Sequence, residues 1–305
     1  MRTVVAAIVS AAVSLLLPGP VVAVASDGPY VAVAEGRSVR DCDRVSIWIT
    51  SQQRVVKLGR KTSCETTSTG SGIAGLTIAR NRALWLHYTG GNIREWSLWT
   101  ATTTVPAPRR LAFAMSEPDS HSPIVIGGGD FDRSQGTYAE GDVLPYAIGR
   151  TVVVLKADGS RSFTWDAPAR VTALDSEPRL LAVAVDDGRV FVLEDGKLIR
   201  TYPGTTAATS VGLIGGAGVA CQRGLALDVF SDDPVVTSRK LRTGEQAAFG
   251  AGWGVALIHR GRIRVMRLGG GPPVANVPGT AAALDNWRFT YASGRRVTTR
   301  LLLSP

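Results

Sequence analysis

The chain has 305 residues, of which 45% are hydrophobic and 7% aromatic, and its formal net charge at pH 7 is +9. This length is ample for one large β domain, and three cysteines without a Cys-x-x-Cys pair exclude a cysteine metal cluster. The basic charge favours acidic partners such as a cell-wall polymer, anionic lipid headgroups or nucleic acid.

The first 25 residues have the layout of a secretory signal peptide. Arg2 provides a short basic region, residues 4–17 are almost unbroken Ala, Val, Ile and Leu, and Ala23-Val24-Ala25 forms a small-x-small cleavage site. This apolar run is too short to cross a bilayer, which takes about 20 residues. We expect residues 1–25 to be removed and residues 26–305 to form one domain, secreted or held in the cell envelope. No later stretch is apolar enough for a transmembrane span.

The first repeat of the mature chain covers residues 29–59, and its first strand is predicted to be missing. Cys42 and Cys64 lie in polar loops that flank this repeat, and an oxidising compartment allows cysteines to pair. We therefore predict a disulfide between these two. Cys221 lies in the apolar stretch GVACQ and is predicted to pack as a small buried hydrophobe.

The next two repeats are predicted between residues 73 and 165. Residues 73–99 form one of them. The stretch RLAFAM at 110–115 opens the other, which continues at 144–165 after an insert at 116–142.

The insert is the predicted contact loop for a partner, because long loops in a regular scaffold are where function concentrates. Its candidate contact residues are His121, Asp130, Phe131 and Tyr138.

The same insert is a candidate calcium site. Five side chains with oxygen atoms lie within thirteen residues, namely Asp130, Asp132, Ser134, Glu140 and Asp142. Alternating oxygen ligands in a Gly-rich loop suit Ca²⁺, which takes 6–8 of them. Arg133 adds a like charge, so a solvated acidic loop is the alternative. No other cofactor is predicted.

The clearest repeat covers residues 171–202. Alternation and turn signals predict four strands, at Val171–Leu174, Leu180–Val185, Val190–Leu193 and Lys197–Tyr202. Asp-Gly pairs between them supply the positive φ values that tight hairpins need. Four antiparallel strands in this length correspond to one propeller blade. The pattern returns at 209–230, 247–268 and 281–303, where the last copy stops after three strands.

One glycine marks the hairpin of every copy, and five of the seven glycines precede Arg. They recur at intervals of 33 to 58 residues, at Gly36, Gly91, Gly149, Gly188, Gly224, Gly261 and Gly294. Self-similarity of this kind in an all-β chain indicates a radial or solenoid array, most often a propeller. We predict a β-propeller of seven four-stranded blades, with the termini meeting in a closing blade; six blades, or a β-solenoid, are the alternatives.

The repeat length and the Asp-Gly and Gly-Arg hairpins resemble the broad group of secreted bacterial β-propellers with WD- or YVTN-like architecture. The resemblance is one of pattern and covers nearly all of residues 28–305. No blade carries the WD signature apart from Trp165-Asp166, and the kelch double glycine does not repeat. The resemblance therefore implies the fold and matches no characterised subfamily.

Enzyme signatures are weak in this sequence. No Gly-x-Ser-x-Gly elbow is present. Asp175 and Asp285 occupy matching repeat positions, which indicates that they cap turns rather than form a glycosidase pair. Arg260, Arg262 and Arg264 alternate along one strand and so share one face. That row predicts either a polyanion site or a solvated strand edge.

We expect an exported, non-enzymatic binding or scaffolding propeller with no catalytic residues. Its partner would be a protein or an anionic cell-envelope polymer; nucleic acid is disfavoured, and the chain is expected to be a monomer. The alternative is an extracellular hydrolase or lyase with its active site on the propeller axis. Clustered carboxylates or a His at the central channel would favour the enzyme, whereas an empty channel lined by Gly and Val, with an apolar or basic rim, would favour the binder.

Overall fold

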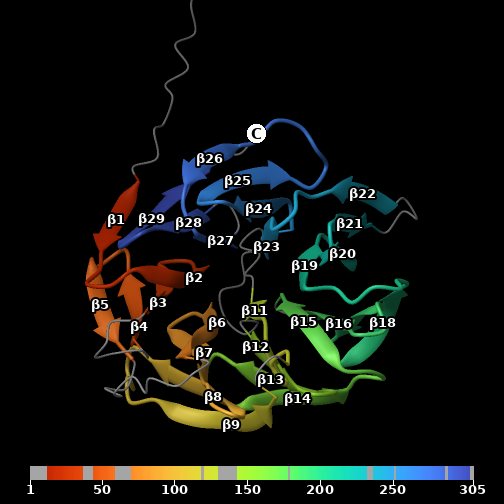
Figure 1. Ribbon diagram of the computed structural model, residues 1–305, viewed down its shortest axis with the longest axis horizontal. Helices are drawn as coiled ribbons and strands as arrows, with labels where there is room; N and C mark the ends of the chain where they lie inside the picture. The colour runs from red at the N-terminus through yellow and green to blue at the C-terminus, as the bar shows by residue number, and fades with distance from the viewer. Residues whose placement is uncertain are drawn as a thin grey trace, which may run out of the picture.

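The computed structural model describes residues 12–36, 44–58, 70–117, 120–129, 143–177, 179–231, 236–250, 252–285 and 288–302. These residues form seven β-sheets arranged as a ring (Figure 1). Among them, no helix is long and apolar enough to cross a membrane. The fold is therefore the predicted seven-bladed β-propeller.

Each blade is a sheet of antiparallel strands that runs from the ring centre outward. Blade 1 contains β2 (Val21–Asp27), β3 (Tyr30–Glu35), β4 (Arg44–Ile49) and β5 (Arg54–Lys57). Blade 2 contains β6 (Ser71–Ala79), β7 (Arg82–Thr89), β8 (Arg94–Thr102) and β9 (Arg109–Ser116). Blade 3 contains β10 (Ile124–Ile126), β12 (Val143–Ile148), β13 (Thr151–Lys156) and β14 (Arg161–Asp166).

The remaining blades repeat this order. Blade 4 contains β15 (Val171–Ser176), β16 (Leu180–Val185), β17 (Val190–Glu194) and β18 (Lys197–Tyr202). Blade 5 contains β19 (Ser210–Ile214), β20 (Gly218–Arg223), β21 (Ala226–Phe230) and β22 (Val236–Lys240). Blade 6 contains β23 (Gln246–Gly250), β24 (Gly254–His259), β25 (Arg262–Arg267) and β26 (Ala275–Pro278). Blade 7 contains β27 (Ala281–Asp285), β28 (Arg288–Ser293), β29 (Arg296–Leu301) and β1 (Val13–Leu16).

All seven predicted turn glycines lie between the second and third strands of a blade, one in each blade. Five of them have a positive φ, from +55° at Gly224 to +96° at Gly188. L-residues with a side chain rarely adopt this conformation, which is why glycine recurs there. The number of repeated turn glycines in the sequence therefore equals the number of blades.

Both chain ends build the closing blade, and Figure 1 shows β1 beside β29. All four residues of β1 pair antiparallel with β29, from Val13 opposite Thr299 to Leu16 opposite Arg296. The C-terminal strands are the three inner ones, as the short last repeat predicted. The outermost strand of this blade comes from the segment that has the layout of a signal peptide.

Blade 1 has its innermost strand, so the prediction that its first strand is missing was wrong. That strand is β2, which starts inside the signal-like segment. Val21 and Val24 are buried between blades 7 and 1. An apolar strand that is covered on both faces has the same composition as a leader, and this similarity hid the strand in the sequence.

The third blade also differs from its prediction. The stretch RLAFAM does not open it, because Arg109–Ser116 pairs with β8 as the outermost strand of blade 2. Instead β10, inside the predicted insert, is the innermost strand of blade 3. It has only three residues, too few for alternation to show in a sequence.

The hydrophobic core is divided into seven clusters, one at each contact between neighbouring blades. Trp48 and Trp85 are fully buried in the clusters on the two sides of blade 1. Because every sheet is covered on both faces, the inner strands are apolar without alternation. The blades thus hold one another in place through these clusters.

Candidate functional site

The innermost strands surround a cavity of about 160 Å³ near the ring axis. Its wall consists of residues from five blades: Val24, Ala25, Ser26, Leu76, Thr77, Ile78, Asp175, Phe249, Gly250, Ala282, Ala283 and Leu284. Of these, Asp175 is the single residue with an ionisable side chain. Ser26 and Thr77 are the other polar side chains among the described residues that line the cavity, so these residues include no pair of carboxyl groups for acid–base chemistry.

The carboxyl group of Asp175 already has a structural partner. Its Oδ2 accepts a hydrogen bond of 2.8 Å from the backbone N–H of Leu213, on the innermost strand of blade 5. Burial raises the pKa of Asp175 to about 7, although the N–H of Leu213 acts in the opposite direction. Asp175 therefore joins blade 4 to blade 5 and also changes its charge near neutral pH.

Two other aspartates make the same kind of contact between blades. Oδ2 of Asp285, in blade 7, accepts a hydrogen bond of 2.5 Å from the N–H of Gly28 in blade 1. Oδ2 of Asp27, in blade 1, accepts one from the N–H of Arg80 beside blade 2. Asp175 and Asp285 do accept hydrogen bonds from backbone N–H groups, as predicted, but these N–H groups belong to the next blade and not to a nearby turn. Asp27 was missed because it adjoins the signal-like segment.

The insert leaves the ring beside this cavity. Gly128 and Gly129 form the short strand β11, which pairs in parallel with Asp175 and Ser176 of β15. Gly129, the last described residue before position 130, therefore lies next to the wall of the central cavity. His121 lies before this point and is exposed.

Several predicted residues lie outside the described residues. They are Asp130, Phe131, Asp132, Ser134, Tyr138, Glu140, Asp142, Cys42 and Cys64. The calcium site, most of the contact loop and the disulfide therefore stay predictions. Among the described residues, no group of three or more His, Cys, Asp or Glu side chains could hold a metal ion.

Cys221 is fully buried in the core between blades 4 and 5, as predicted. It forms no disulfide. Burial raises the pKa of its thiol to about 11, so it is protonated at neutral pH and unreactive.

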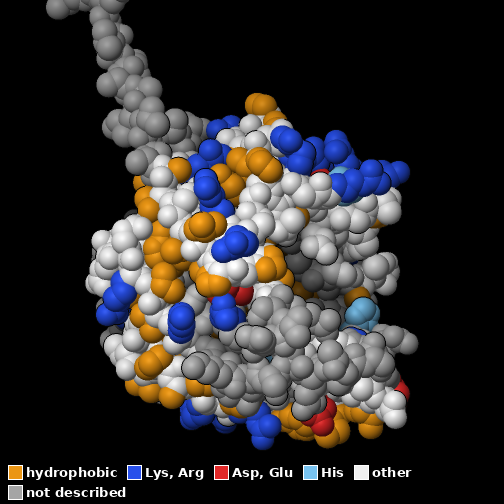
Figure 2. All heavy atoms as spheres, turned by 60° about the vertical axis from the view of Figure 1, so that its left-hand side comes forward, with side chains coloured by type: hydrophobic (Ala, Val, Ile, Leu, Met, Phe, Trp, Pro, Cys, Tyr) orange, Lys and Arg blue, Asp and Glu red, His pale blue; other side chains and the backbone are white. Residues whose placement is uncertain are grey.

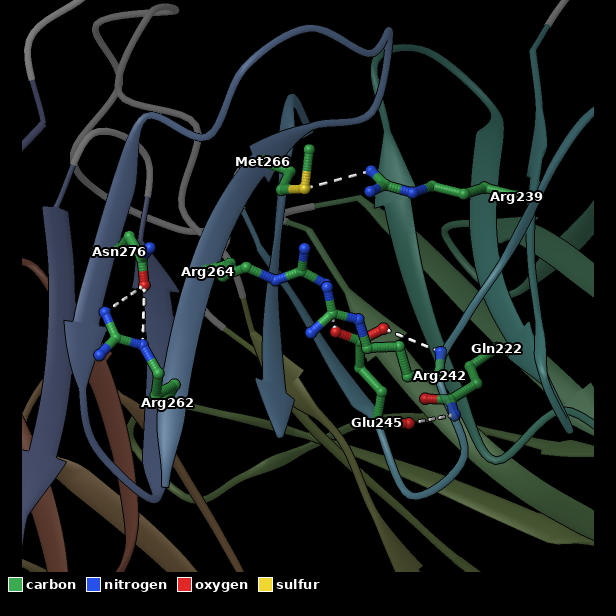
Figure 3. A network of polar contacts seen from close by, with 8 residues as sticks. All are labelled: Gln222, Arg239, Arg242, Glu245, Arg262, Arg264, Met266 and Asn276. Carbon is green, nitrogen blue, oxygen red and sulfur yellow. Dashed lines mark hydrogen bonds and ion pairs between the residues drawn. The ribbon is translucent and has the colours of Figure 1, made fainter. Parts of the chain in front are cut away.

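A second polar region lies between blades 5 and 6 (Figure 3). Glu245 is 3% exposed, and its Oε1 lies 2.5 Å from Nη2 of Arg264. Burial favours the neutral carboxyl group, but the backbone N–H of Arg242 and the Arg264 guanidinium outweigh it, and the net pKa of Glu245 is lowered. Gln222 connects the blades by donating to the carbonyl oxygen of Glu245 and accepting from the N–H of Ala247.

The predicted arginine row is only partly accessible. Arg262 is exposed and donates 2.9 Å and 3.3 Å hydrogen bonds to Oδ1 of Asn276. Arg264 is half-buried against Glu245, and Arg260 lies in the turn before the strand. Figure 2 shows more broadly that Lys and Arg side chains outnumber Asp and Glu on the face drawn.

Comparison with known proteins identifies the fold and nothing finer. No family model matches the chain. No curated protein matches it either. A chain in the "Crystal Structure of Mitotic Checkpoint Complex" matches with a TM-score of 0.57 and 12% identity, over 96% of this chain and 91% of that chain. The computationally designed Ika8 protein matches with a TM-score of 0.50 and 12% identity, over 94% of this chain and 98% of that one.

Proposed function

We propose that this chain is an exported binding or scaffolding propeller whose partner is a protein or a cell-envelope polymer. The observation that carries the proposal is the composition of the axial cavity. The side chains of the described residues that line it are apolar apart from Ser26, Thr77 and Asp175, and Asp175 already bonds to the backbone of blade 5. A hydrolase on the axis would need two free carboxyl groups or a histidine at this place.

The contact region in this proposal is the insert together with the rim around it. Two features support the assignment. The insert starts at the cavity wall, beside Asp175 and Ser176. Its residues 127–142 also join the first and second strands of blade 3, a connection that takes two or three residues in blades 1, 2 and 5, whose turns are fully described.

Export is proposed from the signal-like segment, and the ring sets a condition on it. Cleavage after Ala25 would remove β1 and five of the seven residues of β2. A strand that has been removed cannot pair, so the first residue of the exported chain determines whether the ring closes as described.

The test replaces residues 130–142 by a short Gly-Ser turn and measures co-sedimentation with a purified cell-envelope fraction. We expect binding to be lost while the melting temperature stays unchanged. The matched control shortens the exposed turn at Gly269–Gly271, between β25 and β26, and should bind as the parent does.

Two results would contradict the proposal. One is undiminished sedimentation of the loop variant. The other is release of reducing sugars or free amino groups from the envelope fraction by the parent protein, since that would show hydrolysis.

A further inference from the structure

Charge is distributed unevenly among the blades. Residues 236–268 contain seven Lys and Arg but one acidic residue, Glu245. Residues 171–202, which form blade 4, contain four basic and six acidic residues. The stretch from the outermost strand of blade 5 to the third strand of blade 6 therefore carries a surplus of positive charge, and its position can be examined in the structure.

Four arginines lie on or beside the elements that border the junction of these two blades. Arg239 comes from the outermost strand of blade 5, and Arg242 from the linker that follows it. Arg262 and Arg264 lie two residues apart on β25, so they share one face of that strand, while Ile263 and Val265 are buried on the other.

One contact fixes the two strands relative to each other. Nη1 of Arg239 lies 3.1 Å from Sδ of Met266, which is on the same face of β25 as Arg264. Figure 3 shows Arg239 pointing to Met266, Arg242 and Arg264 lying near Glu245, and Arg262 lying apart from them beside Asn276. We call Arg239, Arg242, Arg262 and Arg264 the arginine face.

Opposite charge at this face is scarce. Glu245 is the one acidic residue that the described structure places there. Its Oε1 pairs with Arg264 and its Oε2 accepts from the backbone N–H of Arg242. Arg239 and Arg262 are instead held by neutral acceptors, a thioether sulfur and an amide oxygen. Among the described residues, the four guanidinium groups of this region are accompanied by one carboxylate, that of Glu245.

We propose that the arginine face binds a linear polyanion whose closely spaced oxyanions are phosphates or carboxylates. A guanidinium presents paired N–H donors that match both groups. Neutral acceptors already orient the guanidinium groups of Arg239 and Arg262 in the absence of a ligand. The arginine face is built from blades 5 and 6 and includes no residue of the insert, so its variants test this proposal without changing the insert.

The polymer is assigned as one without nucleobases. Binding of single-stranded nucleic acid relies on aromatic side chains on which bases stack. In the described parts of blades 5 and 6, no aromatic side chain is exposed: Phe230 is buried, and Phe249 and Trp253 are half-buried.

The experiment measures the affinity of the full chain for polyphosphate and, separately, for polygalacturonate between about 50 and 200 mM salt. The test variant is Arg239→Gln/Arg242→Gln/Arg262→Gln. The matched control is Arg54→Gln/Arg161→Gln/Arg296→Gln, which removes the same charge from exposed positions on blades 1, 3 and 7. Arg264 and Glu245 stay intact because they pair with each other between the blades.

We expect the test variant to bind at least about tenfold more weakly at the lowest salt. The slope of log affinity against log salt should fall by about 2, since each neutralised phosphate on a single strand contributes about 0.7. The control should keep the parental slope. Both variants should have the same melting temperature as the parent. The preferred polymer identifies the oxyanion.

Three outcomes would overturn the proposal. The first is an equal loss of affinity in both variants, which would mean attraction by total charge. The second is no binding of either polymer at about 50 mM salt. The third is equal affinity for single-stranded DNA, which would refute a polymer without bases.

Discussion

Asp27, Asp175 and Asp285 show how a single side chain can join two sheets in this ring. Each is at or near the end of an innermost strand and accepts a backbone N–H from the following blade. A buried amide without a partner costs about 1–3 kcal/mol, so each contact removes a penalty and also fixes the angle between two blades. Asp175 differs from the other two in facing the axial cavity.

Asp175→Asn should change how stability depends on pH. The raised pKa of about 7 means that between pH 4 and pH 7 the unfolded chain releases a proton that the folded chain retains. Stability of the parent therefore falls as the pH rises through this window, by up to about 1.4 kcal/mol per pH unit. The asparagine oxygen can still accept from Leu213. We expect urea unfolding to show the variant more stable than the parent at pH 8, but not at pH 4. A difference that is the same at both pH values would contradict this.

At the scale of the element, the turn between the second and third strands serves different purposes in different blades. Gly224 and Gly188 both have positive φ. A Cβ on Gly224 would meet nothing within 4 Å, whereas one on Gly188 would lie 2.7 Å from the backbone of Gly204 and Thr205. The carbonyl oxygen of Gly188 also accepts from Arg223 of blade 5. The turn of blade 4 is therefore packed against its neighbour, and that of blade 5 is free.

Gly188→Ala and Gly224→Ala form a matched pair that tests this difference. Both pay the backbone cost of about 1–2 kcal/mol for a side chain at positive φ. Only Gly188→Ala must also move the linker between blades 4 and 5, so we expect it to cost at least about 2 kcal/mol more. The melting temperatures of the two variants are compared by thermal unfolding. Equal values would show that the linker between blades 4 and 5 can move at little cost in free energy.

The insert is the element whose metal chemistry stays open to test. If Asp130, Asp132 and Glu140 bind calcium, the folded state gains stability by mass action, about 2.7 kcal/mol at a hundredfold excess over the dissociation constant. We expect the melting temperature to rise in millimolar calcium and not in magnesium. Asp130→Asn/Asp132→Asn should abolish the rise. An unchanged melting temperature in calcium would favour a solvated acidic loop.

At the scale of the whole molecule, the ring is closed by joining the first strand to the last. Ser14 bonds to Thr298 across the β1–β29 pair, and the N–H of Leu17 donates to the carbonyl oxygen of Arg295. The cluster between blades 7 and 1 includes Leu17, Val21 and Val24, all of which are buried. Neighbouring blades support one another, so an open ring would lose support on both sides of the gap.

Deleting residues 1–25 should therefore destabilise the protein strongly. Three buried side chains at about 1.5–3 kcal/mol each represent at least about 5 kcal/mol. For a chain of this size, the melting temperature should fall by at least about 10 °C. Deleting residues 2–11 leaves β1 intact and is the control. Sequencing the N-terminus of the exported protein then shows which form the cell keeps. If the variant that lacks residues 1–25 has the same melting temperature as the parent, β1 does not close the ring in the way described.

The sequence by itself determined the fold class and the number of blades, because a hairpin glycine is a local requirement that recurs once in every blade. It also predicted the strands of blade 4 to within two residues and the burial of Cys221. These features depend on neighbours in the chain, so pattern alone reveals them.

Only the tertiary structure decided which segments pair across the ring. A leader and a strand buried on both faces are equally apolar, so composition could not place Val13–Leu16 beside β29. Glu245 and the arginines around it lie up to 25 residues apart in the chain and meet only when two blades pack. Contacts between blades depend on ring geometry, which local periodicity does not contain, and the arginine face includes such a contact between Arg239 and Met266.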